Sequence, residues 1–262
     1  MGKDADEFAD NYTSTELLAT VASHRLENGK TFFVGTGLPM LACMLAQRTH
    51  APDSVIIFEA GGIGPKIPEL PISVGDSRTF HKALSASSMH DVMSAGQCGY
   101  IDYGFLGAAQ LDPYGNINTT VIGPHSRPKA RLPGSGGAND IGSLCWNTIV
   151  LMRQDKRRFV EEVDFLTTPG YLSGPGAREE AGLPEDSGPY RVITQLGVYD
   201  FDEETKRLRL VERYPNVSVE EIKEKSGFEI IIPDDHEVTD PPTVNEQEVL
   251  HEIDPNGMVL EK

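Results

Sequence analysis

One carboxylate follows directly on an apolar segment, and it is the residue of this sequence best placed to do chemistry. Glu59 follows the apolar run at residues 55–58 and precedes Ala60 and two glycines. Four apolar residues, three of them β-branched, predict a strand buried on both faces. Ligands of open α/β sheets bind in the crevice at the carboxyl ends of the strands, and the glycines at 61 and 62 would let a substrate approach the backbone closely. The alternative is a glutamate that faces solvent or a salt-bridge partner.

A segment of small residues is the second candidate. Residues 134–139 read Gly-Ser-Gly-Gly-Ala-Asn, and such a segment can turn several backbone N–H groups toward one point. An anion or a developing oxyanion needs donors in that arrangement. Taken alone, the segment is more typical of an ordinary flexible loop.

The distribution of charge limits the partners of the chain. Its net charge of −17 argues against nucleic acid and anionic membranes. Residues 200–262 hold 18 acidic and seven basic side chains, whereas residues 124–160 hold two acidic and seven basic ones. This basic segment could bind a phosphorylated ligand, dock an acidic partner chain or coat a hairpin, and the sequence favours none of the three. Its basic residues are Arg127, Lys129, Arg131, Arg153, Lys156, Arg157 and Arg158.

Several well-known sites are missing. The sequence Gly-Thr-Gly at residues 35–37 lacks the third glycine of a dinucleotide-binding motif and predicts a structural turn. Neither GxxxxGK[ST] nor GxSxG occurs, and no serine elbow completes a triad with His90 and Asp91. The seven histidines show no ligand spacing, so neither a metal site nor a permanently bound cofactor is expected.

Nothing in the sequence predicts secretion or membrane insertion. Cys43, Cys98 and Cys145 show no CxxC spacing and are expected to be buried thiols in a reducing cytosol. The first seven residues are acidic and lack the apolar core of a secretory signal. No apolar run approaches the ~20 residues that span a bilayer, so a cytoplasmic protein is expected.

The order of elements near the start predicts an α/β fold. A capping box at residues 13–16 opens a helix, and short strands are expected at residues 31–34 and 55–59. Between these strands Pro39 begins a second helix, which completes a right-handed βαβ unit. Residues 60–90 are rich in Gly, Pro and Ser and predict a long functional loop with a short helix.

The remainder predicts more strands and a late antiparallel segment. Strands are expected at residues 103–109, 147–152 and 163–168, an antiparallel meander at 191–212, and helices at 218–226 and 244–253. The expected fold class is therefore α/β, mainly a parallel sheet with flanking helices plus an antiparallel β meander near the C-terminus. No linker divides the chain convincingly, so a single domain over residues 1–262 is expected.

Eight segments, taken in order, resemble the β subunits of glutaconate CoA-transferase within the family I CoA-transferases. They lie at residues 34–39, 51–53, 56–61, 73–76, 109–118, 134–139, 156–159 and 252–255. The resemblance covers essentially the whole chain, and the set is specific although no single segment is. In that family the catalytic glutamate lies in the segment matched by residues 56–61, so the resemblance places the nucleophile at Glu59. The family's Glu-Ser-Gly reads Glu-Ala-Gly here, and residues 62–72 also depart from the pattern, so the acid substrate is not specified.

The resemblance implies transfer of CoA between acyl-CoA thioesters and free carboxylic acids through a glutamyl-CoA thioester on Glu59. It also implies coenzyme A as a substrate and an α subunit that completes the site, so the chain alone should be inactive. Relatives that lack the glutamate hydrolyse or decarboxylate CoA thioesters, and its retention here favours transfer. A hydrolase, lyase or decarboxylase subunit is the second possibility, and a non-catalytic scaffold subunit is the third.

Two further sets of residues gain roles within this interpretation. The tetrahedral intermediates need oxyanion donors, and the candidates are the backbone N–H groups of Gly136, Gly137 and Ala138, with Asn139 in the same loop. The diphosphate and 3′-phosphate of CoA need positive charge in an acidic chain. The candidates are Arg127, Lys129 and Arg131, which lead directly into the loop.

Overall fold

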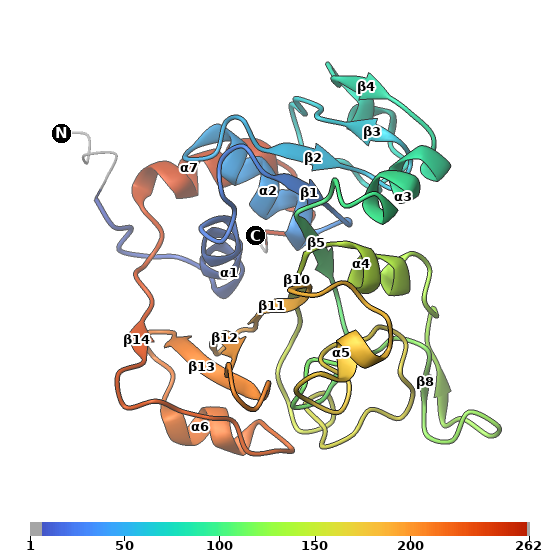
Figure 1. Cartoon of the computed structure of the whole chain (residues 1–262). Helices are drawn as coiled ribbons and strands as arrows, with labels where there is room; N and C mark the ends of the chain where they lie inside the picture. The colour runs from blue at the N-terminus through green and yellow to red at the C-terminus, as the bar shows by residue number, and fades with distance from the viewer. Residues whose placement is uncertain (1–6, 261–262) are drawn as a thin grey trace. The chain divides into compact units, whose positions relative to one another are not determined.

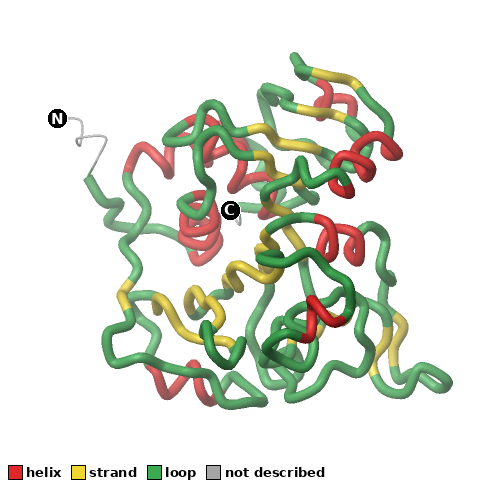
Figure 2. Tube along the Cα trace, viewed as in Figure 1, coloured by secondary structure: helices red, strands yellow, loops and turns green. Residues whose placement is uncertain are grey.

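The computed structural model describes residues 7–260 (Figure 1). The chain divides into two compact units, a first unit of Met1–Phe105 with Asp240–Lys262 and a second unit of Leu106–Thr239. Figure 2 shows that loops and turns make up much of both units. That all 262 residues fold as a single domain stays a prediction.

The first unit contains the predicted βαβ motif. Strand β1 (Thr31–Phe33) runs parallel to β2 (Val55–Ile57), and helix α2 (Leu38–Arg48) connects them with Pro39 in its first turn. Most of α2 is buried, because its middle residues are apolar on every face. The carboxyl ends of β1 and β2 therefore lie at the same edge of the sheet.

The sheet of the first unit extends on both sides of this motif. Strand β5 (Tyr103–Leu106) pairs with β1 in parallel, and the strand order is β5–β1–β2–β3–β4. Strands β3 (Gly62–Ile63) and β4 (Ser85–Ala86) are antiparallel additions beyond β2. The prediction of a long loop at residues 60–90 was therefore wrong in part, because two-residue strands carry no periodic pattern. The short helix expected there is present as η1 (Ser77–Phe80), and α3 (Met89–Gln97) follows β4.

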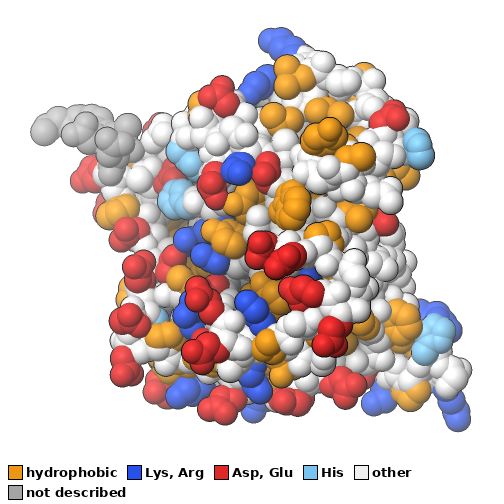
Figure 3. Space-filling view, viewed as in Figure 1, with side chains coloured by type: hydrophobic (Ala, Val, Ile, Leu, Met, Phe, Trp, Pro, Cys, Tyr) orange, Lys and Arg blue, Asp and Glu red, His pale blue; other side chains and the backbone are white. Residues whose placement is uncertain are grey.

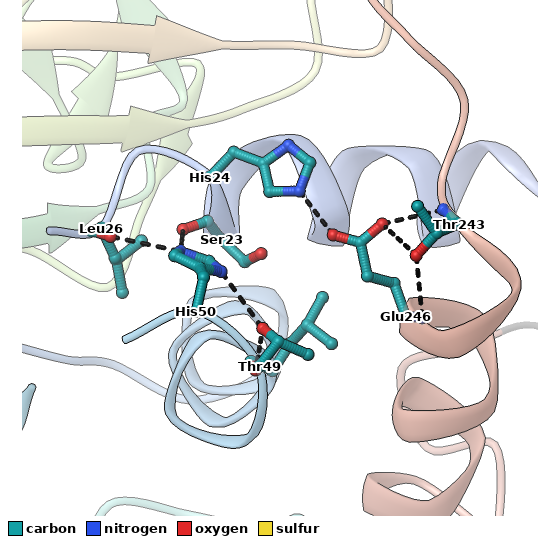
Figure 4. Close-up of polar contacts among 8 residues, drawn as sticks. Ser23, His24, Leu26, Thr49, His50, Thr243 and Glu246 are labelled. Atoms are coloured by element: carbon teal, nitrogen blue, oxygen red, sulfur yellow. Dashed lines mark hydrogen bonds and ion pairs between the residues drawn. The ribbon is translucent and has the colours of Figure 1, made fainter. Parts of the chain in front are cut away.

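Two helices far apart in the sequence, one near each end of the described chain, contact each other within the first unit. Helix α1 (Ser14–Ser23) begins with the predicted capping box, and α7 (Val244–Ile253) begins with a second one. Glu16 in α1 and Glu246 in α7 are the acidic members of these two boxes. Each also accepts a hydrogen bond from a histidine across the helix pair: Glu16 from His251 in α7, and Glu246 from His24, the C-cap of α1. Glu246 Oε1 lies 2.5 Å from His24 Nε2 (Figure 4), and Glu16 Oε1 lies 2.6 Å from His251 Nε2.

The second unit contains the predicted meander. Strand β10 (Asn147–Leu151) runs parallel to β11 (Gly188–Ile193). Strands β12 (Gly197–Phe201) and β13 (Leu208–Arg213) follow in antiparallel order, and β14 (Glu237–Val238) pairs with β13 in parallel. The α/β fold class with parallel strands, flanking helices and an antiparallel segment on the C-terminal side is thus confirmed.

Short elements complete the second unit. Two hairpins, β6–β7 (Gln110–Leu111, Ile117–Asn118) and β8–β9 (Val121–Ile122, Ala130–Arg131), precede helix α4 (Ala138–Leu144), and α5 (Ala177–Glu180) and α6 (Val219–Glu224) come later. The prediction of a strand at residues 163–168 was wrong. Only an isolated bridge between Thr168 and Ile117 forms there.

Candidate active site

Glu59 lies in a tight turn at the carboxyl end of β2. The Gly61 N–H donates to the Phe58 carbonyl oxygen (2.9 Å), and the Phe58 N–H donates to the Gly62 carbonyl oxygen (2.9 Å). Glu59 and Ala60 are therefore the two central residues of a β-turn. The Glu59 side chain is half-buried, and within residues 7–260 its carboxylate has no hydrogen bond or ion pair. A fixed backbone thus carries a carboxylate with free acceptor oxygens, as a nucleophile requires.

The glycines after Glu59 are required by the packing of the protein itself. Gly61 has a φ of +109°, and a Cβ there would lie 2.0 Å from the Ser87 carbonyl oxygen. A Cβ on Gly62 would lie 2.2 Å from the Thr79 carbonyl oxygen. The prediction that these glycines open the backbone to a substrate was therefore wrong, because backbone atoms of neighbouring segments fill that space. Their role is to let the turn that carries Glu59 pack closely.

An ion pair fixes the segment that packs on Gly62. Asp76 caps η1 through the Arg78 N–H, and its carboxylate also accepts hydrogen bonds from Arg78 Nη2 (2.7 Å) and from Arg78 Nε (3.2 Å to each oxygen). These bonds from Arg78 hold the pKa of Asp76 well below its ordinary value. The Thr79 hydroxyl donates to the Asp76 carbonyl oxygen (2.7 Å), which completes a rigid support for the turn.

Open space adjoins the end of the neighbouring strand. Gly35 and Gly37 follow β1, and a Cβ on either would have no other atom within 4 Å. Gly37 also has a φ of +78° and precedes the first residue of α2. Because β1 and β2 are parallel, the edge of the sheet at which Glu59 lies has room for a ligand beside it.

The loop at residues 134–139 in the second unit has a backbone held by hydrogen bonds at several of its residues. A positive φ at Gly136 (+48°) followed by a negative φ at Gly137 (−81°) is typical of a backbone nest that binds anions. The Ala138 N–H already donates to the Ser135 carbonyl oxygen (2.8 Å), and the Asn139 N–H donates to Ser135 Oγ (3.2 Å). In the part of the chain that the structure describes, the N–H groups of Gly136 and Gly137 have no hydrogen-bond acceptor. The structure therefore keeps Gly136 and Gly137 as candidate oxyanion donors and removes Ala138 from the set.

The side chain of Asn139 is also engaged. Its Oδ1 accepts a hydrogen bond from Ser143 Oγ (3.0 Å) one turn further along α4. Asn139 thus stabilises the start of the helix that follows the loop, and a direct contact with substrate is not needed to explain it.

The three basic residues before this loop lie on one hairpin. Arg131 pairs with Val121 in β8–β9, Arg127 lies in the connecting turn, and the Lys129 stem packs near Gly123. All three basic side chains are exposed, and none forms an ion pair with another residue of the described range 7–260. Figure 3 shows Lys, Arg and His side chains gathered at the tip of this hairpin.

The second basic group of the segment lies elsewhere and is partly neutralised. Arg157 and Arg158 both pair with Asp155, at 3.8 and 3.4 Å. The structure thus separates the two halves of the basic segment. Within the segment at residues 124–160, the β8–β9 hairpin is where unpaired positive charges gather in one place.

A group of buried polar residues supports the connection between the hairpins. Gln110, Asp112, Asn116 and Asn118 are all buried and belong to the segment at residues 109–118 that carries the family resemblance. Burial raises the pKa of Asp112 to about 6, although Asn116 and Tyr114 donate hydrogen bonds that act in the opposite direction. The polar composition of the segment does not reveal these contacts, because they depend on the burial of all four side chains in the folded chain.

The remaining candidates are accounted for. Cys43 and Cys145 are buried as predicted, whereas Cys98 is exposed, contrary to the prediction. Residues 7–260 contain no group of three His, Cys, Asp or Glu side chains that could hold a metal ion. None of the helices in that range is long and apolar enough to cross a membrane.

The comparison with known families decides the family. Residues 15–225 match the family model of coenzyme A transferase. The chain belongs to the coenzyme A transferase family. This CoA-transferase is 40% identical over 259 residues to the B subunit of glutaconate CoA-transferase from Acidaminococcus fermentans, and the match covers 96% of each chain. It is 38% identical to the B subunit of 3-oxoadipate CoA-transferase from Pseudomonas knackmussii, over 93% of this chain and 94% of that one.

Solved structures agree with this assignment. The crystal structure of glutaconate coenzyme A-transferase from Acidaminococcus fermentans matches with a TM-score of 0.91 and 38% identity, covering 96% of this chain and 98% of that one. The decarboxylase AibA/AibB matches with a TM-score of 0.82 and 26% identity, covering 95% and 97% of the two chains. The predicted resemblance to CoA-transferase β subunits is therefore confirmed, and the chain is a CoA-transferase.

Proposed function

We propose that this CoA-transferase chain is the β subunit of a two-subunit enzyme that moves CoA between acyl-CoA thioesters and free carboxylic acids. The observation that carries the proposal is the Glu59 carboxylate, which a rigid turn holds at the carboxyl end of β2 and whose oxygens have no partner among residues 7–260. The similarity to two CoA-transferase B subunits at 38–40% identity supports the same chemistry.

Glu59 is the nucleophile in this mechanism. Its carboxylate attacks the carbonyl carbon of the acyl-CoA to form a tetrahedral adduct. The C–S bond of this adduct breaks, so CoA leaves as the thiolate and a mixed anhydride of Glu59 and the acyl group remains. The thiolate then attacks the Glu59 carbonyl carbon, which releases the first acid as its carboxylate and leaves a glutamyl-CoA thioester. A second carboxylate reverses both steps and departs as its CoA ester. Because the energy of the thioester is retained in the anhydride and in the glutamyl thioester, no external energy source is needed, and the kinetics should be ping-pong.

Backbone donors stabilise the tetrahedral intermediates. The free N–H groups of Gly136 and Gly137 are assigned to the negative oxygen that forms in each addition step. A preorganised donor of this kind contributes about 3 kcal/mol to the transition state. Water must be excluded while these species exist, because both the anhydride and the glutamyl thioester hydrolyse.

The unpaired cations of the β8–β9 hairpin are assigned to the phosphates of CoA. Arg127, Lys129 and Arg131 provide three positive charges on a chain whose net charge of −17 otherwise repels a phosphorylated substrate. Their exposure means that each contact is screened by salt and contributes only about 1 kcal/mol.

An α subunit is part of the proposal. Both relatives compared above are named as B subunits, which supports a hetero-oligomer in which the α subunit completes the site. A second candidate function is decarboxylation or hydrolysis of CoA thioesters, and the similarity to a structure named as the decarboxylase AibA/AibB supports the first of these. The lower identity of that structure, 26% against 38% for the glutaconate coenzyme A-transferase structure, and the presence of Glu59 favour transfer.

Replacement of the nucleophile tests the proposal. Glu59→Ala, co-produced with the α subunit, should retain less than a few per cent of transferase activity and unfold at the same temperature as the wild type, because the half-buried side chain fills no core space. The matched control is Glu69→Ala, an exposed glutamate further along the same segment, which should keep full activity. Substantial transferase activity in Glu59→Ala would exclude Glu59 as the nucleophile.

A further inference from the structure

We infer that Thr119 is the positioning residue for the oxyanion loop, an inference that rests on the proposed function of Gly136 and Gly137. Thr119 follows β7 and contacts Gly134, the first residue of the loop. It forms hydrogen bonds with both the N–H and the carbonyl oxygen of Gly134. The Gly134 N–H donates to the Thr119 carbonyl oxygen (2.9 Å), and Thr119 Oγ1 donates to the Gly134 carbonyl oxygen (2.8 Å). A single residue thus fixes the peptide groups on both sides of the Gly134 Cα, and these two hydrogen bonds between Thr119 and Gly134 are called the clamp below.

Thr119 is itself held by a buried neighbour. The Thr119 N–H donates to Thr167 Oγ1 (2.9 Å). The Thr167 hydroxyl also lies 2.7 Å from Thr120 Oγ1. The Thr120 N–H donates to Oδ1 of Asn118, a residue with no exposed surface. The clamp on Gly134 is therefore continuous with the buried polar group of residues 110–118 and does not depend on a mobile surface side chain.

The far end of the loop is fixed independently. The loop leads into α4, where the buried Arg178 guanidinium donates to the Gly142 carbonyl oxygen (3.2 Å). Gly142 also packs tightly, because a Cβ there would lie 2.2 Å from Thr168 Cγ2. Gly136 and Gly137 therefore lie between two anchored points, Gly134 and Gly142, and the orientation of their free N–H groups follows from both.

The geometry of Gly134 makes the clamp necessary. Gly134 has a φ of +95°, in the region that favours glycine, and a Cβ there would have no other atom within 4 Å. Gly134 has no side chain of its own to anchor it, and within residues 7–260 its two backbone hydrogen bonds are both to Thr119. Loss of the Thr119 hydroxyl removes one of these two bonds and lets the loop donors rotate away from the oxyanion.

Two substitutions and one control test the inference in the complex with the α subunit. Thr119→Val keeps the shape and removes the hydroxyl, and Thr119→Ser keeps the hydroxyl. The matched control is Thr148→Val in β10, because Thr148 Oγ1 is buried and, within residues 7–260, has no hydrogen-bond partner. The readouts are kcat and KM for acyl-CoA, and amide hydrogen exchange of the peptide that covers residues 133–139.

Thr119→Val should lower kcat and kcat/KM together by about threefold to tenfold, with KM changed less than twofold, because the loss falls on the transition state. Amide exchange at residues 133–139 should become faster by a similar factor. Thr119→Ser should restore both readouts, and Thr148→Val should change neither. Unchanged exchange in Thr119→Val would overturn the clamp, and faster exchange with unchanged kcat would overturn its role in positioning.

A negative result with the Thr119 variants can be told apart from a failure of the proposed function. Whether Glu59 forms a covalent intermediate is tested on the wild-type complex alone. A thioester reaction without that intermediate would still need an oxyanion donor, so the Thr119 variants would report on the loop in either case.

Discussion

The two reciprocal histidine–glutamate pairs between α1 and α7 should stabilise the first unit measurably. The perturbation is the double substitution Glu16→Gln and Glu246→Gln. Glutamine is also accepted at the third position of a capping box, so both helix starts are kept while the negative charges facing His251 and His24 are removed.

The magnitude follows from the contacts of each carboxylate. A hydrogen bond to a charged group contributes about 1.5–3 kcal/mol, against about 1 kcal/mol for a neutral one. The His24 and His251 side chains are 46% and 62% exposed, so solvent screens the pairs and the lower end of the difference applies. Each substitution should therefore cost about 0.5 kcal/mol, and the double variant about 1 kcal/mol if the sites are independent.

The effect should depend on pH in a defined direction. Burial alone would raise the pKa of Glu16 and Glu246, but hydrogen bonds from the capping threonines and the histidines outweigh it, so both folded pKa values lie below the ordinary value. The stabilisation is therefore fully present above the ordinary glutamate pKa of about 4.3 and is lost as the pH falls through the lowered values.

Urea unfolding followed by circular dichroism at pH 6 and at pH 3 measures this effect. The double variant should be less stable than the wild type at pH 6, and the difference should shrink at pH 3. Glu248→Gln, an exposed glutamate on α7, is the control and should change the free energy of unfolding by less than about 0.5 kcal/mol. Equal stability of wild type and double variant at pH 6, or a difference that does not shrink at pH 3, would refute the reasoning.

Three other substitutions or reactions test separate features of the molecule. Gly61→Ala should destabilise the first unit by more than about 2 kcal/mol and reduce transferase activity, because its Cβ would lie 2.0 Å from the Ser87 carbonyl oxygen; wild-type stability in thermal unfolding would contradict this. Cys98 is the one exposed thiol, so a thiol reagent should modify it rapidly in the native chain while the two buried cysteines react only after unfolding. Arg127→Ala or Arg131→Ala should raise the KM for acyl-CoA by about threefold to fivefold at low salt and less at high salt. An unchanged KM at low salt would leave this hairpin without a role in binding CoA.

The parts of the fold that could be predicted from the sequence are those with strong local signals. The capping box at residues 13–16, Pro39 in the first turn of α2, and the bounds of α7 all follow from side chains that act on their own backbone. The strands β3 and β4 were missed because two residues cannot show a periodic pattern, and their pairing depends on contacts distant in sequence.

The same distinction applies to the candidate site. The position of Glu59 after a strand could be predicted, because the apolar run and the glycines mark the strand end. The reason for Gly61 and Gly62 could not, because Ser87 and Thr79 approach them from other parts of the chain. The engagement of the Ala138 N–H and the clamp at Thr119 likewise depend on backbone conformation that residue types alone do not specify.

The most direct test of the central claim is to trap the covalent intermediate on Glu59. The wild-type complex is incubated with acyl-CoA in the absence of an acceptor acid, borohydride is added to reduce any glutamyl thioester to the alcohol, and peptides are analysed by mass spectrometry. We predict an alcohol at Glu59, in the peptide that contains residues 55–66, and none when acyl-CoA is omitted or when Glu59→Ala replaces the wild type. Reduction at another residue, or no reduction under conditions in which the complex turns over, would contradict the assignment of Glu59 as the nucleophile.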